Sequence, residues 1–334
     1  MQDKNELNDI FRRFTPTPLV ADLNVMGRSL RFETNSPVVL EYASRAFARY
    51  KSLPSSPNEF RWRLISDPSS GLRPPWPRRF GFSDEGIRFI NFDQRAFLAV
   101  DLSTRDAVGF LSEELANDEM GFYSPYLSDL FDMTAAALGL TEITAGCVVL
   151  NDQALLVFGG PRSGKTTSAY LAGRLGMELH ADQVTCLEFV AGTLRAWGQF
   201  WPPAFRTETL QFLPELLAIT RPVCCCDFTL LCLQDSPVRP AKARSVAPSA
   251  CVFLERSAAE SPQLALLSEA ELTPLLAQSL PFKEDSAFDF QRAEILSALA
   301  KLPAYRLAYP ADPQIAAALF PELLRDLQTT ESKL

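Results

Sequence analysis

Apolar and polar residues alternate loosely over Leu23–Thr34, which predicts a strand or a hairpin that turns around Met26-Gly27-Arg28. The pattern then becomes helical. Ser36-Pro37 is typical of a helix start, because Ser caps the first turn and Pro fits the first helical position. Apolar side chains follow at helical spacing: Val39, Tyr42, Ala43, Ala46, Phe47 and Tyr50. We expect this helix to end near Leu53-Pro54.

Short apolar runs separated by turn signals indicate β-structure over residues 60–65 and 80–112. Between them, residues 71–79 carry three Arg and a Trp. We interpret this stretch as a solvated, proline-stiffened loop, with a basic substrate lip as the alternative. From Ser124 to Leu140, apolar residues on one side predict a helix that Gly139 ends.

The pattern changes near residue 143 to a strand, a loop, a helix and a strand, which is the opening of an α/β nucleotide-binding unit. A length of 334 residues suits one large or two medium domains. We predict a smaller mixed α/β N-terminal domain over residues 1–138 and an α/β P-loop domain over residues 139–334.

Residues Ala154–Phe158 form a continuous apolar run, as expected for a central strand buried on both faces. A glycine-rich loop follows, and Thr166–Leu175 then predicts a helix that Gly176 closes. The loop has the G-x-x-x-x-G-K-T pattern of a Walker A motif. It also has the strand–loop–helix context that this motif requires.

Each residue type in this loop has a chemical reason, and its sequence is Gly159-Gly160-Pro161-Arg162-Ser163-Gly164-Lys165-Thr166. Gly159 and Gly164 let the backbone turn with its N–H groups inward, where these and the helix N-terminus hold phosphate oxygens. Lys165 supplies a charge to the β- and γ-phosphates, and Thr166 offers a hydroxyl to Mg²⁺. We predict that ATP and Mg²⁺ bind here, with Thr167 completing the contacts. The alternative is a glycine turn without a ligand.

A second acidic element is expected after such a loop. Leu179-His180-Ala181 reads as a short strand that ends in Asp182, 17 residues after Lys165. The end of that strand can lie beside the loop, which predicts a catalytic role or a role as metal ligand for Asp182. The alternative is an Asp that opens a turn. His180 is the single His of the chain, and we expect it to pack on the sheet, with proton transfer as the alternative.

Composition narrows the function classes. The formal net charge of -8 disfavours nucleic acids and anionic membranes as partners. No stretch approaches 18 apolar residues, and the N-terminus lacks the apolar core of a signal peptide, so we expect no membrane and a cytoplasmic location. The seven Cys, with Cys224-Cys225-Cys226 in an expected buried strand, are read as reduced structural thiols. A homo-oligomer is left open.

Two charged positions outside the loop are weaker candidates. Arg206 lies in an expected loop near the nucleotide side, and a surface salt bridge is the plainer interpretation of it. Glu255-Arg256 ends the apolar run Cys251–Leu254. A Glu at a strand end can contact a metal, but an exposed ion pair is expected.

At the loop, its helix and Leu179–Val184, the chain resembles the bacterial HPr kinase/phosphorylase family and its HPr-kinase-related relatives. Their P-loop fold is similar to that of phosphoenolpyruvate carboxykinase. Similarity extends outward to Leu23–Leu53, Cys251–Arg256 and Ala304–Leu307. The resemblance implies a kinase in which Asp182 accepts the proton of a substrate hydroxyl while Lys165 and magnesium neutralise the γ-phosphate.

The chain departs from the family pattern at two positions. Gln183 stands where the family has a second Asp, and Thr144 stands where such kinases often carry a His. No match is seen to the C-terminal segment that serves HPr binding and phosphorolysis. HPr itself is therefore not the expected substrate.

Three functions remain open. The first is an ATP- and Mg-dependent kinase that transfers the γ-phosphate to a hydroxyl, with Ser expected, on a peptide, a protein or a small molecule. The second is a nucleotide-binding regulatory module with little or no turnover, which Gln183 and Thr144 favour. The third is a plain NTPase or a carboxykinase-type enzyme.

Overall fold

A computed structural model describes residues 15–67, 80–84, 86–92, 96–211, 213–222, 228–231, 238, 242–258, 260–280, 288–310 and 312–331. The chain divides into two compact units, Met1–Leu130 and Phe131–Leu334. The division lies within helix α4 (Ser128–Thr134), whereas the sequence analysis placed the domain boundary after residue 138.

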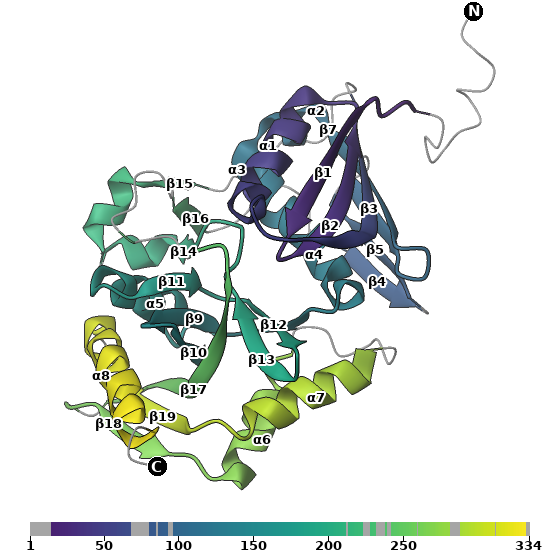
Figure 1. Cartoon of the computed structure of the whole chain (residues 1–334). Helices are drawn as coiled ribbons and strands as arrows, with labels where there is room; N and C mark the ends of the chain where they lie inside the picture. The colour runs from purple at the N-terminus through teal and green to yellow at the C-terminus, as the bar shows by residue number, and fades with distance from the viewer. Residues whose placement is uncertain are drawn as a thin grey trace, which may run out of the picture. The chain divides into compact units, whose positions relative to one another are not determined.

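The N-terminal unit is built on a seven-stranded mixed sheet in the order β1-β2-β3-β7-β6-β5-β4 (Figure 1). Its strands are β1 (Leu19–Val25), β2 (Arg28–Thr34), β3 (Ser56–Asp67), β4 (Phe80–Asp84), β5 (Ile87–Asn91), β6 (Phe97–Asp101) and β7 (Asp106–Ser112). Strands β2, β3 and β7 run parallel to one another, and the other pairs are antiparallel. The helical segments are α1 (Pro37–Phe47), η2 (Ala48–Tyr50), α2 (Glu113–Asn117), α3 (Glu119–Gly121) and η3 (Phe122–Leu127).

The predicted hairpin and the first helix are confirmed. Strands β1 and β2 pair around a turn in which Met26 and Gly27 have φ values of 53° and 83°. Ser36 caps α1, because its hydroxyl accepts a 3.4 Å hydrogen bond from the Val39 N–H. The α-helix ends at Phe47 and continues as one 3₁₀ turn to Tyr50, a few residues before the predicted end.

The helix predicted from Ser124 to Leu140 is confirmed over most of its length, but it begins at Pro125 and changes from π to α to 3₁₀ geometry along the way. Ser124 has non-helical φ and ψ values of −142° and 114°, as expected for a residue that precedes a proline, here Pro125. The chain then passes through α4 into a 3₁₀ segment, η4 (Ala135–Leu138). Gly139 ends it in the left-handed conformation with a φ of 75°, as predicted.

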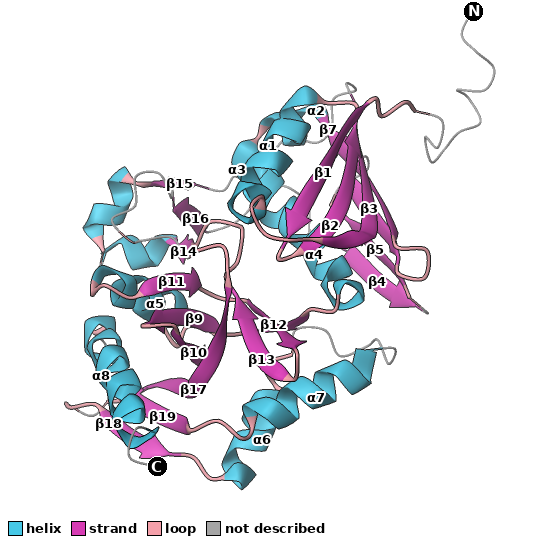
Figure 2. Cartoon of the chain, viewed as in Figure 1, coloured by secondary structure: helices cyan, strands magenta, loops and turns pink. Residues whose placement is uncertain are grey.

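The second unit contains a nine-stranded mixed sheet (Figure 2). Seven strands lie in the order β11-β9-β10-β17-β13-β12-β8, and β19 pairs with both β17 and β18. They are β8 (Thr141–Ile143), β9 (Gly146–Leu150), β10 (Gln153–Gly159), β11 (Glu178–Ala181), β12 (Thr185–Val190), β13 (Thr193–Trp197), β17 (Ser245–Arg256), β18 (Gln263–Leu266) and β19 (Ala304–Tyr309). Strands β10, β17 and β19 are parallel, so their carboxyl ends meet at one edge.

Two hydrophobic clusters cover the two faces of this sheet. One contains side chains of α5 (Lys165–Arg174) and α8 (Pro313–Glu331), and the other contains those of α6 (Glu269–Ala277) and α7 (Asp289–Leu299). Strand β10 contributes Leu155 and Val157 to the first cluster and Leu156 and Phe158 to the second. The prediction of a central strand buried on both faces is therefore confirmed.

A small three-stranded antiparallel sheet in the order β14-β16-β15 packs beside the first cluster. It consists of β14 (Ala204–Arg206), β15 (Thr220–Pro222) and β16 (Phe228–Leu231), with η5 (Thr207–Gln211) and η6 (Pro214–Ala218) between its first two strands in the chain. Phe205 and Leu216 belong to that cluster. The N–H of Ala204, the first residue of this sheet, donates to the Asp182 carboxylate at 3.2 Å, so the sheet is tied to the end of β11.

Several sequence-based expectations concern other parts of the chain. Residues 71–79 and Cys224-Cys225-Cys226 lie outside the described residues. Cys147, Cys186 and Cys251 are free and buried, and burial raises the pKa of the Cys147 and Cys251 thiols to about 12. In the described part of the chain, no helix combines the length and the apolar character needed to cross a membrane.

Candidate phosphate-binding site

The glycine-rich loop connects the carboxyl end of β10 to the start of α5. Positive φ values of 148°, 63° and 93° at Gly159, Arg162 and Gly164 give it its sharp turns. A Cβ on Gly159 would collide with the Ser163 side chain and lie 2.9 Å from the Leu254 carbonyl oxygen. Glycine is therefore required at position 159 by both conformation and space.

The Lys165 side chain folds back over this loop. Its Nζ donates hydrogen bonds to the carbonyl oxygens of Gly159 at 2.7 Å and Gly160 at 3.1 Å. The residue is only 9% exposed, and this burial lowers the pKa of its ammonium group, while the nearby Asp182 carboxylate opposes the shift. The ammonium group is thus held at the mouth of the loop, close to a carboxylate.

Asp182 follows β11 directly and lies beside Thr166 at the start of α5. The Thr166 hydroxyl donates to the Asp182 main-chain oxygen at 3.5 Å. The Asp182 carboxylate is buried, with its Oδ2 accepting a hydrogen bond from the Ala204 N–H at 3.2 Å. Its Oδ1 is buried and has no hydrogen-bond partner. An orphaned carboxylate oxygen beside a threonine hydroxyl is a donor set that suits a hard cation such as Mg²⁺.

Burial raises the pKa of the Asp182 carboxyl to about 6, and the hydrogen bond from the Ala204 N–H to Oδ2 opposes that shift. A pKa near the working pH is suited to proton transfer. In addition, the Asp182 N–H donates to the Gln199 side-chain oxygen at 3.0 Å, which fixes the main chain of Asp182.

A cavity of about 980 Å³ opens over the loop, and all of its lining residues belong to the second unit. All nine residues Gly159–Thr167 line it, as do Thr144 and Gln183. Asp182 does not line it, because its side chain lies behind the wall formed by its neighbours. Where the cavity lining has charged side chains, these are Arg162, Lys165, Arg206, Arg256 and the single carboxylate Glu208.

The rest of the lining is neutral. Thr144, Gln183, Gln278 and Ser279 present hydroxyl and amide groups, and the main chain joins two of them, since the Thr144 N–H donates to the Ser279 carbonyl at 2.6 Å. Phe158 and Phe253 are stacked with ring centroids 4.6 Å apart and also line the cavity. The cavity therefore combines a cationic side over the loop with a neutral side of hydroxyl, amide and aromatic groups.

The weaker candidates from the sequence differ in their outcome. Arg206 lines the cavity, but from strand β14 rather than from the expected loop. Glu255 does not line it, and it forms the expected exposed ion pair, with 3.9 Å between its Oε2 and Arg306 Nε. Within the described ranges, no group of three or more His, Cys, Asp or Glu side chains is arranged to hold a metal ion.

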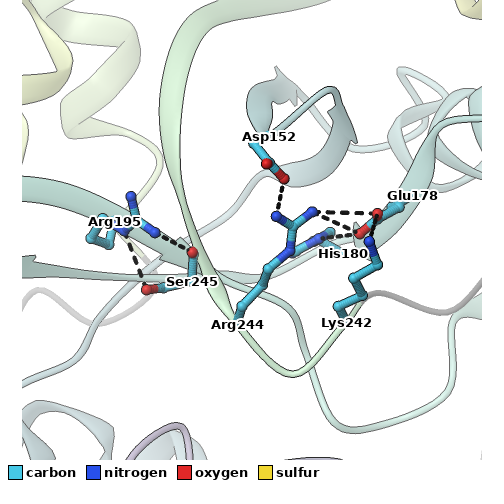
Figure 3. A network of polar contacts seen from close by, with 7 residues as sticks. All are labelled: Asp152, Glu178, His180, Arg195, Lys242, Arg244 and Ser245. Atoms are coloured by element: carbon cyan, nitrogen blue, oxygen red, sulfur yellow. Dashed lines mark hydrogen bonds and ion pairs between the residues drawn. The ribbon is translucent and has the colours of Figure 1, made fainter.

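His180 lies in a separate polar network and does not line the cavity (Figure 3). Its Nε2 is 3.4 Å from Glu178 Oε2, and Glu178 is also paired with Lys242 at 3.6 Å and Arg244 at 3.3 Å. Arg244 pairs in turn with Asp152 in the β9–β10 turn. The network joins β11 to neighbouring segments, which fits the structural interpretation of this His.

Sequence reasoning missed two residues of the site, Arg256 and Tyr309. Arg256 was noted only as the end of a strand, although the carboxyl end of a strand parallel to β10 was a usable signal. The position of Tyr309 could not be predicted from the sequence, because a Tyr at the end of a mostly apolar strand such as β19 is typical of ordinary core packing.

No family model matches this sequence, and no curated protein matches it. Among solved structures, the HPr(Ser) kinase/phosphatase from Coxiella burnetii is similar at 11% sequence identity. The match covers 57% of this chain and 98% of that chain with a TM-score of 0.29.

Proposed function

We propose that this protein binds ATP with Mg²⁺ at residues 159–167 and transfers the γ-phosphate to a hydroxyl, with Ser expected, of a peptide, a protein or a small molecule. The observation that supports this best is the buried Asp182, which has one unpartnered carboxylate oxygen, accepts a hydrogen bond from Thr166 at its main-chain oxygen and lies near Lys165. A glycine turn without a ligand does not need such a costly buried carboxylate.

The phosphate chain is bound by the loop. The backbone N–H groups of Gly160, Arg162 and Gly164 and the N-terminus of α5 favour negative charge, and the Lys165 ammonium group adds a full positive charge beside the loop. Thr166 and Asp182 are the residues that would hold Mg²⁺. Bound there, the ion would neutralise the negative charge of the phosphates that the loop and Lys165 do not neutralise.

Asp182 would accept the proton of the acceptor hydroxyl as the new O–P bond forms and the bond to the leaving ADP breaks. Its raised pKa, about 6, leaves it ionised at neutral pH while keeping it a usable base. The acceptor would approach over Gln183 and Thr144, which line the cavity next to Asp182 and carry no charge.

Transfer of radiolabelled phosphate from [γ-³²P]ATP tests the proposal, with synthetic Ser peptides, small alcohols and cell extract as acceptors. Asp182→Asn keeps the shape of the side chain but removes its charge. We expect it to lower transfer by about 10²–10⁴-fold with little change in ATP affinity if Asp182 is the base. If Asp182 mainly holds Mg²⁺, ATP affinity should instead become weaker and less dependent on Mg²⁺. Equal transfer and equal binding by both proteins would contradict the assignment of Asp182.

A nucleotide-binding regulatory module is the second candidate function. It is favoured by the position of Asp182, which is 1% exposed and does not line the cavity, and by Gln183 in place of an acidic neighbour. Gln183→Asp separates the two candidates. It should raise transfer or strengthen Mg²⁺ binding if the protein is a kinase. Tight ATP binding without transfer by either protein, to any acceptor, would favour the regulatory module.

A further inference from the structure

Arg256 is the last residue of β17, next to the glycine-rich loop. Strands β10 and β17 are parallel, and Gly159, where the loop starts, pairs with Leu254. Arg256 follows Leu254 by two residues, so β17 extends past the start of the loop and Arg256 lies at its flank. The strand order puts β11 and Asp182 on one side of β10 and β17 on the other. The loop is therefore flanked by a carboxylate on one side and by a guanidinium group on the other.

Two contacts orient the Arg256 guanidinium group, which lies close to the loop. It stacks over the Tyr309 ring at 4.7 Å from the centroid, and its Nη1 donates to the Pro310 carbonyl oxygen at 3.3 Å. Its Nη2 is 3.2 Å from the point where a Cβ on Gly164 would lie. A guanidinium group that is stacked in this way loses less freedom on binding an anion than a mobile one.

Tyr309 links Arg256 to the loop backbone. The residue is fully buried, and its hydroxyl donates a 2.5 Å hydrogen bond to the Ser163 carbonyl oxygen. Burial raises the pKa of this hydroxyl, so it keeps its proton and remains a donor at neutral pH. In a trans peptide the carbonyl and the next N–H point in opposite directions. The bond therefore turns the Gly164 N–H away from Tyr309.

The charges that line the cavity favour an anion with several negative charges. Among the described residues, four cationic side chains line it, Arg162, Lys165, Arg206 and Arg256, against the one carboxylate of Glu208. Glu208 is 3.9 Å from Arg162, and both of these side chains are exposed. In loops of this kind, the backbone amides bind the α- and β-phosphates and the Lys reaches the β- and γ-phosphates. The terminal phosphate carries the most negative charge and has oxygens left for a second cation at the flank of the loop.

We infer that Arg256 forms a second phosphate-binding position, which contacts the terminal phosphate of a nucleoside triphosphate, and that Tyr309 positions both Arg256 and the Ser163–Gly164 peptide. The inference rests on the proposed function, because it needs a triphosphate at the loop. The contact is electrostatic and changes no covalent bond. It distinguishes ATP from ADP, which lacks the phosphate that Arg256 binds.

Isothermal titration of the full chain with Mg-ATP and Mg-ADP tests this. Arg256→Ala should weaken ATP binding by about 10- to 100-fold, as expected for loss of a charge-assisted hydrogen bond, and ADP binding by less than about 3-fold. Arg306→Ala is the matched control. Arg306 lies on the neighbouring strand β19, its side chain is exposed, and it does not line the cavity, so both affinities should stay within about 2-fold.

Two further variants keep the test decisive if Arg256→Ala folds poorly. Arg256→Lys keeps the charge but loses the planar fork, and should weaken ATP binding by an intermediate factor. Tyr309→Phe keeps the ring and loses the hydroxyl. It should weaken ATP and ADP binding equally, by about 3- to 10-fold, because the loop peptide is no longer held.

The outcomes separate this inference from the proposed function. A wild-type protein that fails to bind Mg-ATP would overturn both. If the wild type binds Mg-ATP but folded Arg256→Ala or Arg256→Lys has unchanged affinities, or loses ATP and ADP affinity equally, only the inference about Arg256 is wrong. Unchanged affinities in Tyr309→Phe would remove the positioning role of Tyr309.

Discussion

At the scale of single residues, Lys165 and Asp182 matter most, because both carry charge in a place with little water. Lys165 is 9% exposed and bonded to two loop carbonyls, and Asp182 is 1% exposed with an orphaned oxygen. Burial lowers the pKa of Lys165 and raises the pKa of Asp182, and the Asp182 carboxylate only partly offsets the shift at Lys165. Both positions are costly for the folded chain, which favours a role in binding or catalysis.

Lys165→Ala should weaken Mg-ATP binding by about 10- to 100-fold, because it removes the charge aimed at the β- and γ-phosphates. Isothermal titration measures the change. Lys301→Ala, at an exposed position just after α7, is the control and should bind as the wild type does. Equal affinities of wild type and folded Lys165→Ala would contradict the assigned role.

Asp182 should make the protein less stable as the pH rises. Its pKa is about 6 in the folded chain against 3.8 for the ordinary group, so between pH 4 and 6 the folded state keeps a proton that the unfolded state has lost. The free energy of unfolding then falls with pH, by roughly 3 kcal/mol in total. Asp182→Asn removes this titration. Its stability relative to the wild type should rise from pH 4 to pH 7.

Urea unfolding in the presence of EDTA measures this difference without bound metal. Asp101 is a control of opposite sign, because hydrogen bonds from Ser103 lower the pKa of its carboxyl. Asp101→Asn should lose stability relative to the wild type as the pH rises. A pH-independent difference for Asp182→Asn would show that the carboxyl is not shifted by burial.

At the scale of elements, the loop between β10 and α5 is held from outside as well as by its own glycines. Gly164 has a φ of 93°, and a Cβ there would collide with the Tyr309 hydroxyl. Gly160 has open space around it. The fold therefore requires glycine at position 164, for both backbone conformation and space. It leaves room for a side chain at position 160.

Gly164→Ala should weaken Mg-ATP binding by about tenfold or more, because Ala is strained at this φ and displaces Tyr309. Gly160→Ala is the matched control from the same loop. It keeps the backbone N–H and meets no neighbour, so its affinity should stay within about 3-fold of the wild type. Isothermal titration of both variants checks this pair. Similar losses in both would mean that the loop geometry is not what limits binding.

At the scale of the whole molecule, the chain consists of two compact units, and the cavity belongs entirely to the second. The two large hydrophobic clusters on the faces of its sheet also consist only of residues from this unit. A fragment of this size can bury a core of its own. None of the described residues of the N-terminal unit lines this cavity.

Residues 131–334 expressed alone should therefore fold cooperatively and bind Mg-ATP within about threefold of the full chain. Circular dichroism during thermal unfolding and isothermal titration are the measurements, with the same fragment carrying Lys165→Ala as the negative control. A fragment that unfolds without a cooperative transition, or binds ATP more than about tenfold more weakly, would show that the units depend on each other.

The sequence by itself determined the features that depend on neighbours in the chain. The cap at Ser36, the turn at Met26-Gly27, the central strand Ala154–Phe158 and the course of the glycine-rich loop follow from spacing and from backbone preferences. These are local energies, so a short stretch of residues contains the information for them. The helix predicted from Ser124 to Leu140 is also present, but Pro125 keeps Ser124 out of it, and its 3₁₀ end was not predicted.

Only the tertiary structure decided what surrounds the loop. Asp182 lies behind the wall of the cavity because Ala204 and Gln199 pack on it, and Arg256 and Tyr309 reach the loop from strands about 90 and 150 residues further along the chain. A run of apolar residues predicts a buried strand, but it does not predict which position the strand takes in the sheet. Strand order and register are set by packing between distant segments, so the partners of Lys165 and Gly164 could not be predicted from their own neighbours in the sequence.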